Sequence, residues 1–517
     1  MEIQSSIANL TRTRILTAFI SLLLSLQAVY FDDITNSDGV LYMQMAEAYL
    51  LGGLQAVQTL YDWPAYAILI AWVHQLTSFS IETSGLILSS LFFILLTDAL
   101  VLISSLLVAN ARQLNIAAIL ILCFTPINEY RDFILRDPGY WAFSSLALYQ
   151  FMLFVNLPSY KTASLWQIFM IIAILFRIEG SVILLGLPLF LLFVRQPMEG
   201  IKQIIQVSYL LFVSLIGIIA FVLSQPDLIA AFGKLGSIAS YIDLTAYSDK
   251  LYRYAGVIKH QILNQYSEDY AAFILISGML VMFAYKIIKA FSVSYLIVYF
   301  ATASKVLKPH SKQLQHLLLY FFALNILLLI VFLFKQYFMS SRYTLMALIG
   351  LLLLVMHRLS HGIERLWLAK NKILLSIIAF ALFYSVADTS TQSGDKSYIK
   401  EAAIWAANNL PKDSLIMTDD GFILHYFNAE KANAAICVKQ IYQTSDFLRR
   451  HTKTMDYTTG PCAADQSDSY QYYDYLIVVE KKRKYELKNY LKKLNLTKIH
   501  NTGDEAKDSA SIYRVNK

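Results

Sequence analysis

Six carboxylates gather between residues 32 and 82, in a segment that contains no lysine or arginine. Acids held together without a counter-charge have raised pKa values, which is the condition that a general base needs. Asp38 stands near the start of a stretch, residues 37–53, whose spacing predicts a helix with Tyr42, Met45 and Tyr49 on one face. Asp38 is therefore a candidate base, and capping of this helix is its alternative role. The six acids are Asp32, Asp33, Asp38, Glu47, Asp62 and Glu82.

Arginine and aspartate alternate in a second polar segment, residues 127–138. Arg131-Asp132 and Arg136-Asp137 precede Pro138, which is typical of the first turn of a helix. Arginine binds phosphate through a bidentate fork, and an adjacent aspartate can accept a hydroxyl proton or orient that arginine. Ion pairs that anchor the loop are an equally good interpretation of this segment.

Further ionisable residues lie at the ends of apolar runs. Arg177 and Glu179 follow one such run, where charges are costly unless they are paired or hydrated. Lys335 ends another run and Arg342 opens the next, and snorkelling to the interface is the alternative role for all four residues. His74 and Asp98 are single polar groups in apolar surroundings, and we interpret them as helix-packing residues.

The composition places these residues in a polytopic membrane protein. Of 517 residues, 57% are hydrophobic and 15% charged, against roughly 45–50% and about 25% in soluble domains. A net charge of +7 comes without a Lys/Arg-rich block in the first 388 residues, so nucleic-acid binding is not expected. The motifs of P-loop, dinucleotide, zinc-protease and serine-hydrolase sites are also missing. We interpret Cys123 as a core residue, and leave open whether Cys437 and Cys462 form a disulfide.

Apolar segments predict eleven membrane-spanning helices, because a helix of about 20 residues crosses a bilayer core. Two of them, 114–127 and 164–176, are short, and we expect their ends to run on into the polar residues that follow, including Arg177 and Glu179. Segment 290–304 is either an interfacial helix or a twelfth span. The eleven segments are 15–31, 83–108, 114–127, 139–157, 164–176, 181–194, 204–223, 271–289, 315–334, 342–357 and 372–388.

The distribution of lysine and arginine predicts a cytoplasmic N-terminus. The outer loops are then 32–82, 127–138 and 224–270, and residues 1–388 form the transmembrane domain. The polar tail, 389–517, is predicted to be a small extracytoplasmic α/β domain. Its expected helices are 398–409, 422–427 and 481–494, and its expected strands are 414–417, 433–438, 475–479 and 511–515.

The order of these motifs resembles that of the GT-C glycosyltransferases. The resemblance covers the whole chain, and it is closest to the branch that contains protein O-mannosyltransferases and the lipid A aminoarabinose transferase. The matching motifs are Asp38-x-x-x-Tyr42-x-x-x-Ala46, Tyr61-Asp62-Trp63-Pro64, Arg136-Asp137, Arg177-x-Glu179-Gly180 and Arg342-Tyr343.

The resemblance implies a donor and roles for these residues. Such enzymes take a sugar from a polyprenyl-phosphate donor on the outer face of the membrane, and inverting attack by an acceptor hydroxyl needs a base. The first-loop acid falls on Asp38, but many members have an adjacent acidic pair there, and the adjacent pair of this chain is Asp32-Asp33. The second-loop acid falls on Asp137, with Asp132 as its competitor. The candidates for binding the donor phosphate or the acceptor are Arg136, Arg177, Arg342, Asp132, Glu179 and Tyr42, and the three arginines are the candidates for the phosphate.

Several questions stay open at this level. The acceptor is a glycan, a lipid or a protein, and the bacterial inner membrane is the expected location. No nucleotide is expected, and no metal is required, although clustered carboxylates leave a divalent cation open. Alternative functions are a transporter or flippase of lipid-linked sugar, a polymerase or ligase of surface polysaccharide, and a receptor or assembly scaffold.

Overall fold

Contacts within the computed structural model divide the chain into two compact units. One unit comprises residues 1–30 and 42–392, and the other comprises residues 31–41 and 393–517. The structure describes residues 2–211, 244–302, 311–390, 396–411, 414–418, 420–430, 436–438, 470–481, 491–504 and 507–517.

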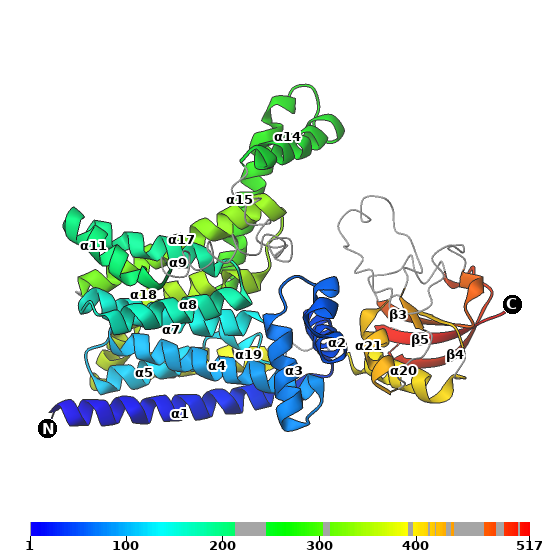
Figure 1. Ribbon diagram of the computed structural model, residues 1–517, viewed down its shortest axis with the longest axis horizontal. Coiled ribbons are helices and arrows are strands. Elements are labelled where there is room, and N and C mark those ends of the chain that lie inside the picture. The colour runs from blue at the N-terminus through cyan, green and yellow to red at the C-terminus, as the bar shows by residue number, and fades with distance from the viewer. Residues whose placement is uncertain are drawn as a thin grey trace, which may run out of the picture. The chain divides into compact units, whose positions relative to one another are not determined.

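The first unit is helical (Figure 1). Among its described helices, six are long and apolar enough to cross a membrane, and four apolar helical runs are shorter. This confirms a polytopic α-helical protein, whereas the number of eleven spans stays a prediction. The α-helices are α1 (Glu2–Phe31), α2 (Ser37–Leu60), α3 (Ala65–Thr77), α4 (Ile81–Ser105), α5 (Ala111–Leu122), α6 (Thr125–Asn128), α7 (Asp137–Asn156), α8 (Tyr160–Phe176), α9 (Gly180–Gly186), α10 (Leu191–Val194), α11 (Pro197–Val207), α14 (Leu244–Gln261), α15 (Ala271–Ala290), α16 (Val293–Ala301), α17 (Lys312–Gln336), α18 (Leu345–Leu368) and α19 (Lys372–Ser390).

Helix α7 lies between α4 and α8 and is buried along most of its length. Small side chains on the facing helices, among them Ser89 of α4 and Ser145 and Ala147 of α7, are fully buried. Helices in lipid associate through close backbone approach rather than through the hydrophobic effect, so small residues favour this packing. The arrangement fixes the first turn of α7, where Asp137 lies.

The two short predicted spans begin earlier than expected and do not run on at their ends. Asn110 and Ser159 cap α5 and α8, accepting hydrogen bonds from the backbone N–H of Gln113 at 3.0 Å and of Thr162 at 3.2 Å. Helix α8 ends at Phe176, so the prediction that it continues through Arg177 and Glu179 is wrong. The segment 114–127 is likewise broken, because the backbone is extended at Phe124 before α6 begins.

Two further segments can be compared with their predictions. Helix α16 has nine residues, about 14 Å, and is therefore too short to be the twelfth span that segment 290–304 left open. Segment 204–223 lies mostly outside the described residues. The predicted end of the 37–53 helix is confirmed, since Gly53, at φ 65°, kinks α2.

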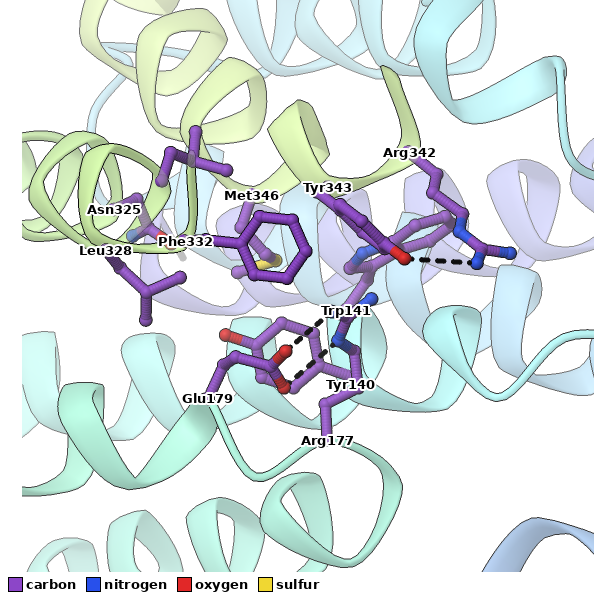
Figure 2. A pocket seen from close by; sticks show the side chains of 11 residues that line it. Tyr140, Trp141, Arg177, Glu179, Asn325, Leu328, Phe332, Arg342, Tyr343 and Met346 are labelled. Atoms are coloured by element: carbon purple, nitrogen blue, oxygen red, sulfur yellow. Dashed lines mark hydrogen bonds and ion pairs between the residues drawn. The ribbon is translucent and has the colours of Figure 1, made fainter. Parts of the chain in front are cut away.

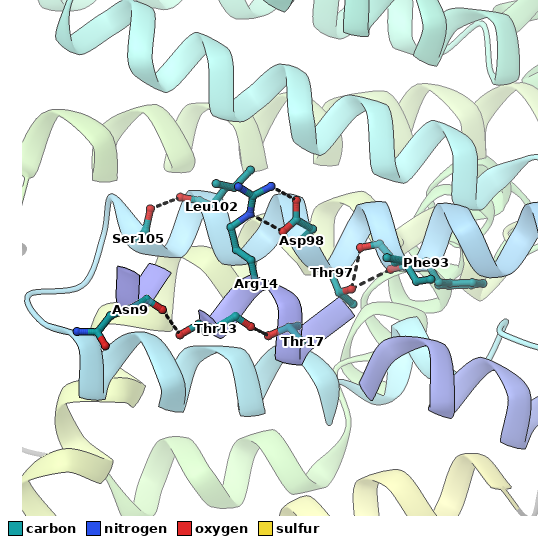
Figure 3. A network of polar contacts seen from close by, with 10 residues as sticks. Asn9, Thr13, Arg14, Thr17, Phe93, Thr97, Asp98, Leu102 and Ser105 are labelled. Atoms are coloured by element: carbon teal, nitrogen blue, oxygen red, sulfur yellow. Dashed lines mark hydrogen bonds and ion pairs between the residues drawn. The ribbon is translucent and has the colours of Figure 1, made fainter. Parts of the chain in front are cut away.

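An ion pair joins α1 to α4 within their apolar stretches (Figure 3). The guanidinium of Arg14 donates to both carboxylate oxygens of Asp98, at 2.7 and 2.8 Å. On the same helix, Thr13 and Thr17 donate to backbone carbonyls of the preceding turn, those of Asn9 and Thr13. Charged groups inside a membrane are tolerated when paired in this way, so Asp98 is a helix-packing residue, as predicted.

The second unit contains a five-stranded sheet in the order β2-β1-β3-β5-β4. Helices α20 (Ser397–Asn409) and α21 (Gly421–Glu430) share one hydrophobic core with it, around Ala402, Phe427 and Ile477. The predicted α/β domain is confirmed, but β4 was missed. Most of the predicted helix 481–494, and Cys462 of the predicted cysteine pair, lie outside the described residues. The strands are β1 (Ile416–Thr418), β2 (Ile436–Val438), β3 (Tyr475–Lys481), β4 (Leu496–Gly503) and β5 (Asp508–Val515).

Replacement by alanine should destabilise the fold at one glycine of the helical unit and not at another. A Cβ at Gly362 of α18 would lie 2.5 Å from Cβ of Thr302, whereas a Cβ at Gly278 of α15 would meet nothing within 4 Å. Gly362→Ala is expected to lower the free energy of unfolding by about 1–3 kcal/mol through overpacking. Thermal unfolding of the detergent-purified variants measures this effect, and equal melting temperatures for Gly362→Ala and the control Gly278→Ala would contradict it.

Candidate functional site

The site is built around one arginine that binds two carboxylates. Arg177 directly follows α8, Asp137 is the first residue of α7, and Glu179 directly precedes α9. The Arg177 guanidinium donates through Nη2 and Nε to Glu179, at 2.7 and 3.3 Å, and through Nη1 to Asp137. The Arg177 side chain is 9% exposed and that of Asp137 3%. Three predicted residues therefore meet in one buried ionic group.

Local sequence explains why the chain can form this group. Arg177 adopts an extended conformation, which ends α8 and turns its side chain away from the helix path. Gly139 lets the first turn of α7 approach closely, because a Cβ there would lie 2.8 Å from the Phe176 ring. Gly180 similarly sits against Tyr140, with 3.3 Å from an added Cβ to that ring. The two glycines bring the end of α8 against the start of α7.

The electrostatics of the group keep Glu179 ionised. Burial opposes the charged form of Glu179, but the Arg177 guanidinium outweighs burial and lowers the pKa of Glu179 to about 2. Asp137 lies in the first turn of α7, where the positive end of the helix dipole favours a carboxylate. Arg177 is thus neutralised locally, and its role is to join three helix ends.

A second arginine, Arg342, contacts the same aromatic ring as Arg177, that of Tyr343. The Cζ atoms of Arg177 and Arg342 lie 4.6 and 5.1 Å from the ring centroid of Tyr343, and Arg342 donates to the Tyr343 hydroxyl at 3.2 Å (Figure 2). Both arginines, Glu179 and Tyr343 line a small cavity of about 20 Å³. Phe332 closes one side, with its ring centroid 4.9 Å from that of Tyr343.

The predicted residues of the first outer loop connect to this site in part. Tyr42 packs edge-on against Tyr66, at 5.1 Å between ring centroids, and Tyr66 reaches the Phe176 ring at 6.4 Å. Arg136 lies over the ring of Tyr61, 5.4 Å from its centroid. The Tyr61-Asp62-Trp63-Pro64 motif and the Arg136-Asp137 motif are therefore neighbours in space.

The remaining predicted acids are not among the residues that line the cavity. Asp38 lies in the first turn of α2, within the second unit, and Asp132 is half-buried in the turn before α7. Asp33 accepts a long hydrogen bond of 3.4 Å from the backbone N–H of Lys396. Burial raises the pKa of Asp32 to about 6 against the opposing charge of Lys396. The raised pKa expected for this acidic segment is thus found at Asp32, and Asp38 stays a candidate base.

The sequence interpretation missed several residues that line the cavity. Tyr140, Trp141 and Asn325 lie on its wall, and Trp141 and Asn325 are almost fully buried. Asn325 donates to the carbonyl of Phe321 at 2.8 Å within α17. Its signal was available, since Asn325 is an amide in the middle of the apolar run 315–334. The aromatic residues carry no such signal, because membrane helices are rich in them.

Comparisons with known proteins give matches among solved structures. No family model and no curated protein matches the chain. The chain is similar to two structures of ArnT from Cupriavidus metallidurans, one in the apo state and one bound to undecaprenyl phosphate, with TM-scores of 0.41 and 0.40. In both, the identity is 12%, and the match covers 96% of this chain and 97% of that one. It is also similar to the Archaeoglobus fulgidus oligosaccharyltransferase tethered to an acceptor peptide, at 13% identity over 81% of this chain and 63% of that one, with a TM-score of 0.41.

Both of these proteins are GT-C glycosyltransferases, the family that the sequence resembles. Identities of 12–13% and TM-scores near 0.4 are too low to transfer an activity, a substrate or a residue's role to this chain. Function has to be argued from the contacts of its own residues.

The depressed pKa of Glu179 predicts a stability that depends on pH. Because the folded-state pKa, about 2, lies below the ordinary value of 4.5, ionised Glu179 stabilises the fold above about pH 4.5, and this contribution is lost as the pH falls towards 2. Glu179→Gln should therefore melt several degrees below wild type at pH 7, and the difference should shrink by pH 3. Melting curves from pH 7 to pH 3 test this, with Asp269→Asn, at an exposed position, as the control. A difference that stays constant over this range would contradict it.

Proposed function

We propose that the protein is an integral-membrane glycosyltransferase that moves a sugar from a polyprenyl-phosphate donor to an acceptor hydroxyl. The observation that carries the proposal is the pair of arginines, Arg177 and Arg342, on the ring of Tyr343 beside a cavity between membrane helices. A sugar attached through phosphate to a long lipid must be reached at the depth of the membrane. A cationic site among apolar helices meets this requirement, and the motif order of the chain agrees with it.

The balance of arginines and carboxylates in the site indicates which arginines would hold the donor phosphate. Arg136, Arg177 and Arg342 provide three cations, whereas Asp137 and Glu179 provide two carboxylates, so the group has a net charge of +1. The two carboxylates already bind Arg177. Arg342 and Arg136 are therefore the residues that would contact the phosphate, and Arg177 would position the helix ends that carry them. Fixed cations in a partly dehydrated site stabilise the charge that develops on a leaving phosphate by several kcal/mol.

The transfer is a single displacement. The acceptor oxygen forms a bond to the anomeric carbon while the bond from that carbon to the phosphate oxygen breaks, which inverts the anomeric centre. The bonding pair leaves with polyprenyl phosphate, and the acceptor proton goes to a carboxylate, for which we propose Asp38. Asp38 stands one helical turn before Tyr42 on α2. General-base catalysis of this kind contributes typically 10²–10⁴-fold to the rate.

Transport of a lipid-linked sugar is the rival function. Transporters use ionisable groups near the middle of the membrane. Two acids within long apolar helices, Asp98 of α4 and Glu364 of α18, are bound by side chains of neighbouring helices: Arg14 binds Asp98 bidentately, and Gln113 donates to Glu364 at 2.6 Å. Both acids thereby serve helix packing. The ionic residues at the breaks between helices fit a site for an anionic substrate better than a path across the membrane.

Asp38→Asn is expected to abolish sugar transfer while folding is retained, because the amide cannot accept the acceptor proton. The assay follows release of polyprenyl phosphate from a panel of polyprenyl-phosphate sugars by the protein in native membrane lipid. Asp62→Asn, at an exposed position of the same acidic segment, is the matched control and should turn over like wild type. Wild-type-like turnover by Asp38→Asn would remove Asp38 from the mechanism, and a comparison with Asp32→Asn would then test the acid with the raised pKa.

Arg342→Gln is expected to weaken binding of undecaprenyl phosphate by roughly 10- to 100-fold, because one hydrogen-bonded charge on a phosphate is worth roughly 1.5–3 kcal/mol. Native mass spectrometry of the detergent-solubilised protein measures the affinity without turnover. The exposed Arg365, at the far end of α18, gives the control variant Arg365→Gln. Equal affinities of wild type and Arg342→Gln would place the phosphate elsewhere.

A further inference from the structure

Helix α11 presents its apolar residues outward and packs a polar residue inward. Met198, Ile201 and Ile205 are 80%, 47% and 55% exposed, and Lys202 is exposed on the same face. Their spacing of three, four and seven residues places these four side chains in one stripe. The buried residues of the helix are Gly200, Gln203 and Val207. A helix at a water-facing surface would have the reverse arrangement, so the outward face of α11 is suited to a lipid surface.

Contacts on the inner side hold α11 in this orientation. Arg195 donates to the Gln203 side chain at 3.2 Å and to the backbone carbonyl of Val155 at 2.6 Å. Gln203 in turn donates to Glu199 at 2.9 Å. Gly200 lies against α10, because an added Cβ would be 3.0 Å from the Leu191 carbonyl oxygen. These contacts fix which face points outward.

The outward stripe borders a cavity of about 370 Å³. Tyr209 closes the cavity together with Tyr160, their rings meeting edge-on at 5.5 Å, and its hydroxyl lies 2.6 Å from that of Ser164. Lys202 lines the cavity, and Lys161 follows Tyr160 in the chain. In Figure 1 the helix lies at the end of the helical unit where α1 begins, which is the predicted cytoplasmic end.

We propose that this cavity binds an anionic phospholipid of the cytoplasmic leaflet. An acyl chain lies along Met198, Ile201 and Ile205, and the phosphate of the head group is bound by Lys202. Three observations carry the assignment: the outward apolar stripe, the cavity beside it, and a lysine at its edge that complements a negative head group. Basic residues near the cytoplasmic surface attract anionic lipids in this way. The site is separate from the proposed transfer reaction and does not depend on it.

Native mass spectrometry of the full chain in detergent tests the proposal with three probes. Phosphatidylglycerol should bind, phosphatidylcholine should bind more weakly, and sn-glycerol 3-phosphate, which has no acyl chain, should neither bind nor compete. Lys202→Gln should lower the affinity for phosphatidylglycerol about fivefold, the effect of one lysine near an anionic surface. Lys202→Arg should retain the affinity, because it keeps the charge.

Lys372→Gln is the matched control, since Lys372 is an exposed lysine at the start of α19 on the same predicted face. It should bind phosphatidylglycerol like wild type. Equal affinity for phosphatidylcholine and phosphatidylglycerol, or an undiminished affinity in Lys202→Gln, would overturn the role of charge. Competition by sn-glycerol 3-phosphate would show a simple phosphate site and overturn the role of the apolar cavity.

Discussion

The pairing of Arg177 with Asp137 and Glu179 is the constraint on which the candidate site depends. Removing three charges from water is costly, and mutual attraction offsets that cost only when the geometry is good and the donors are satisfied. Arg177 meets this condition with a bidentate contact to Glu179 and a further contact to Asp137. Its partners come from the start of α7 and from the break between α8 and α9. The ionic group therefore requires α8 to end at Phe176, and it holds three helix ends together where the site lies.

The size of the cavity has a consequence for how a substrate would enter. A volume of about 20 Å³ accommodates about one water molecule, whereas a sugar phosphate needs far more room. The ionic residues are held from several directions, so a ligand larger than water would have to displace the aromatic wall. Tyr343 and Phe332 meet edge-on in the cavity lining, and Tyr343 contacts both arginines through its ring and Arg342 also through its hydroxyl. A phosphate that draws Arg342 away from the Tyr343 hydroxyl would release this wall, which couples binding of the anion to opening of the site.

Most of the helical unit could be predicted from apolar runs, because the length and composition of a membrane helix are local properties. The ends could not, since they depend on partners distant in sequence: α8 stops where Arg177 meets Asp137, forty residues away. The contact of Arg177 with Glu179, two residues apart, could be predicted from the sequence. The contact of the Tyr343 ring with two arginines could not. Strand β4 was missed because its residues, Leu496–Gly503, are mostly polar and partly exposed, so they lack the alternation that marks a half-buried strand. Its place is set by pairing with β5.

A further arginine, Arg131, adds to the argument for an anionic substrate. Arg131 is fully buried, yet the hydrogen bonds that the structure gives it all go to neutral groups, namely Asn128, Ser21 and Ser25. Its guanidinium lies 5.0 Å from the centroid of the Phe93 ring, and the same ring lies 6.3 Å from Trp141, which lines the cavity. Arg14 and Arg177 are neutralised by carboxylates, whereas these contacts leave the charge of Arg131 uncompensated. Because salt screens buried charges less than exposed ones, Arg131 raises the positive potential around residues 127–138, which suits the anionic substrate that we propose.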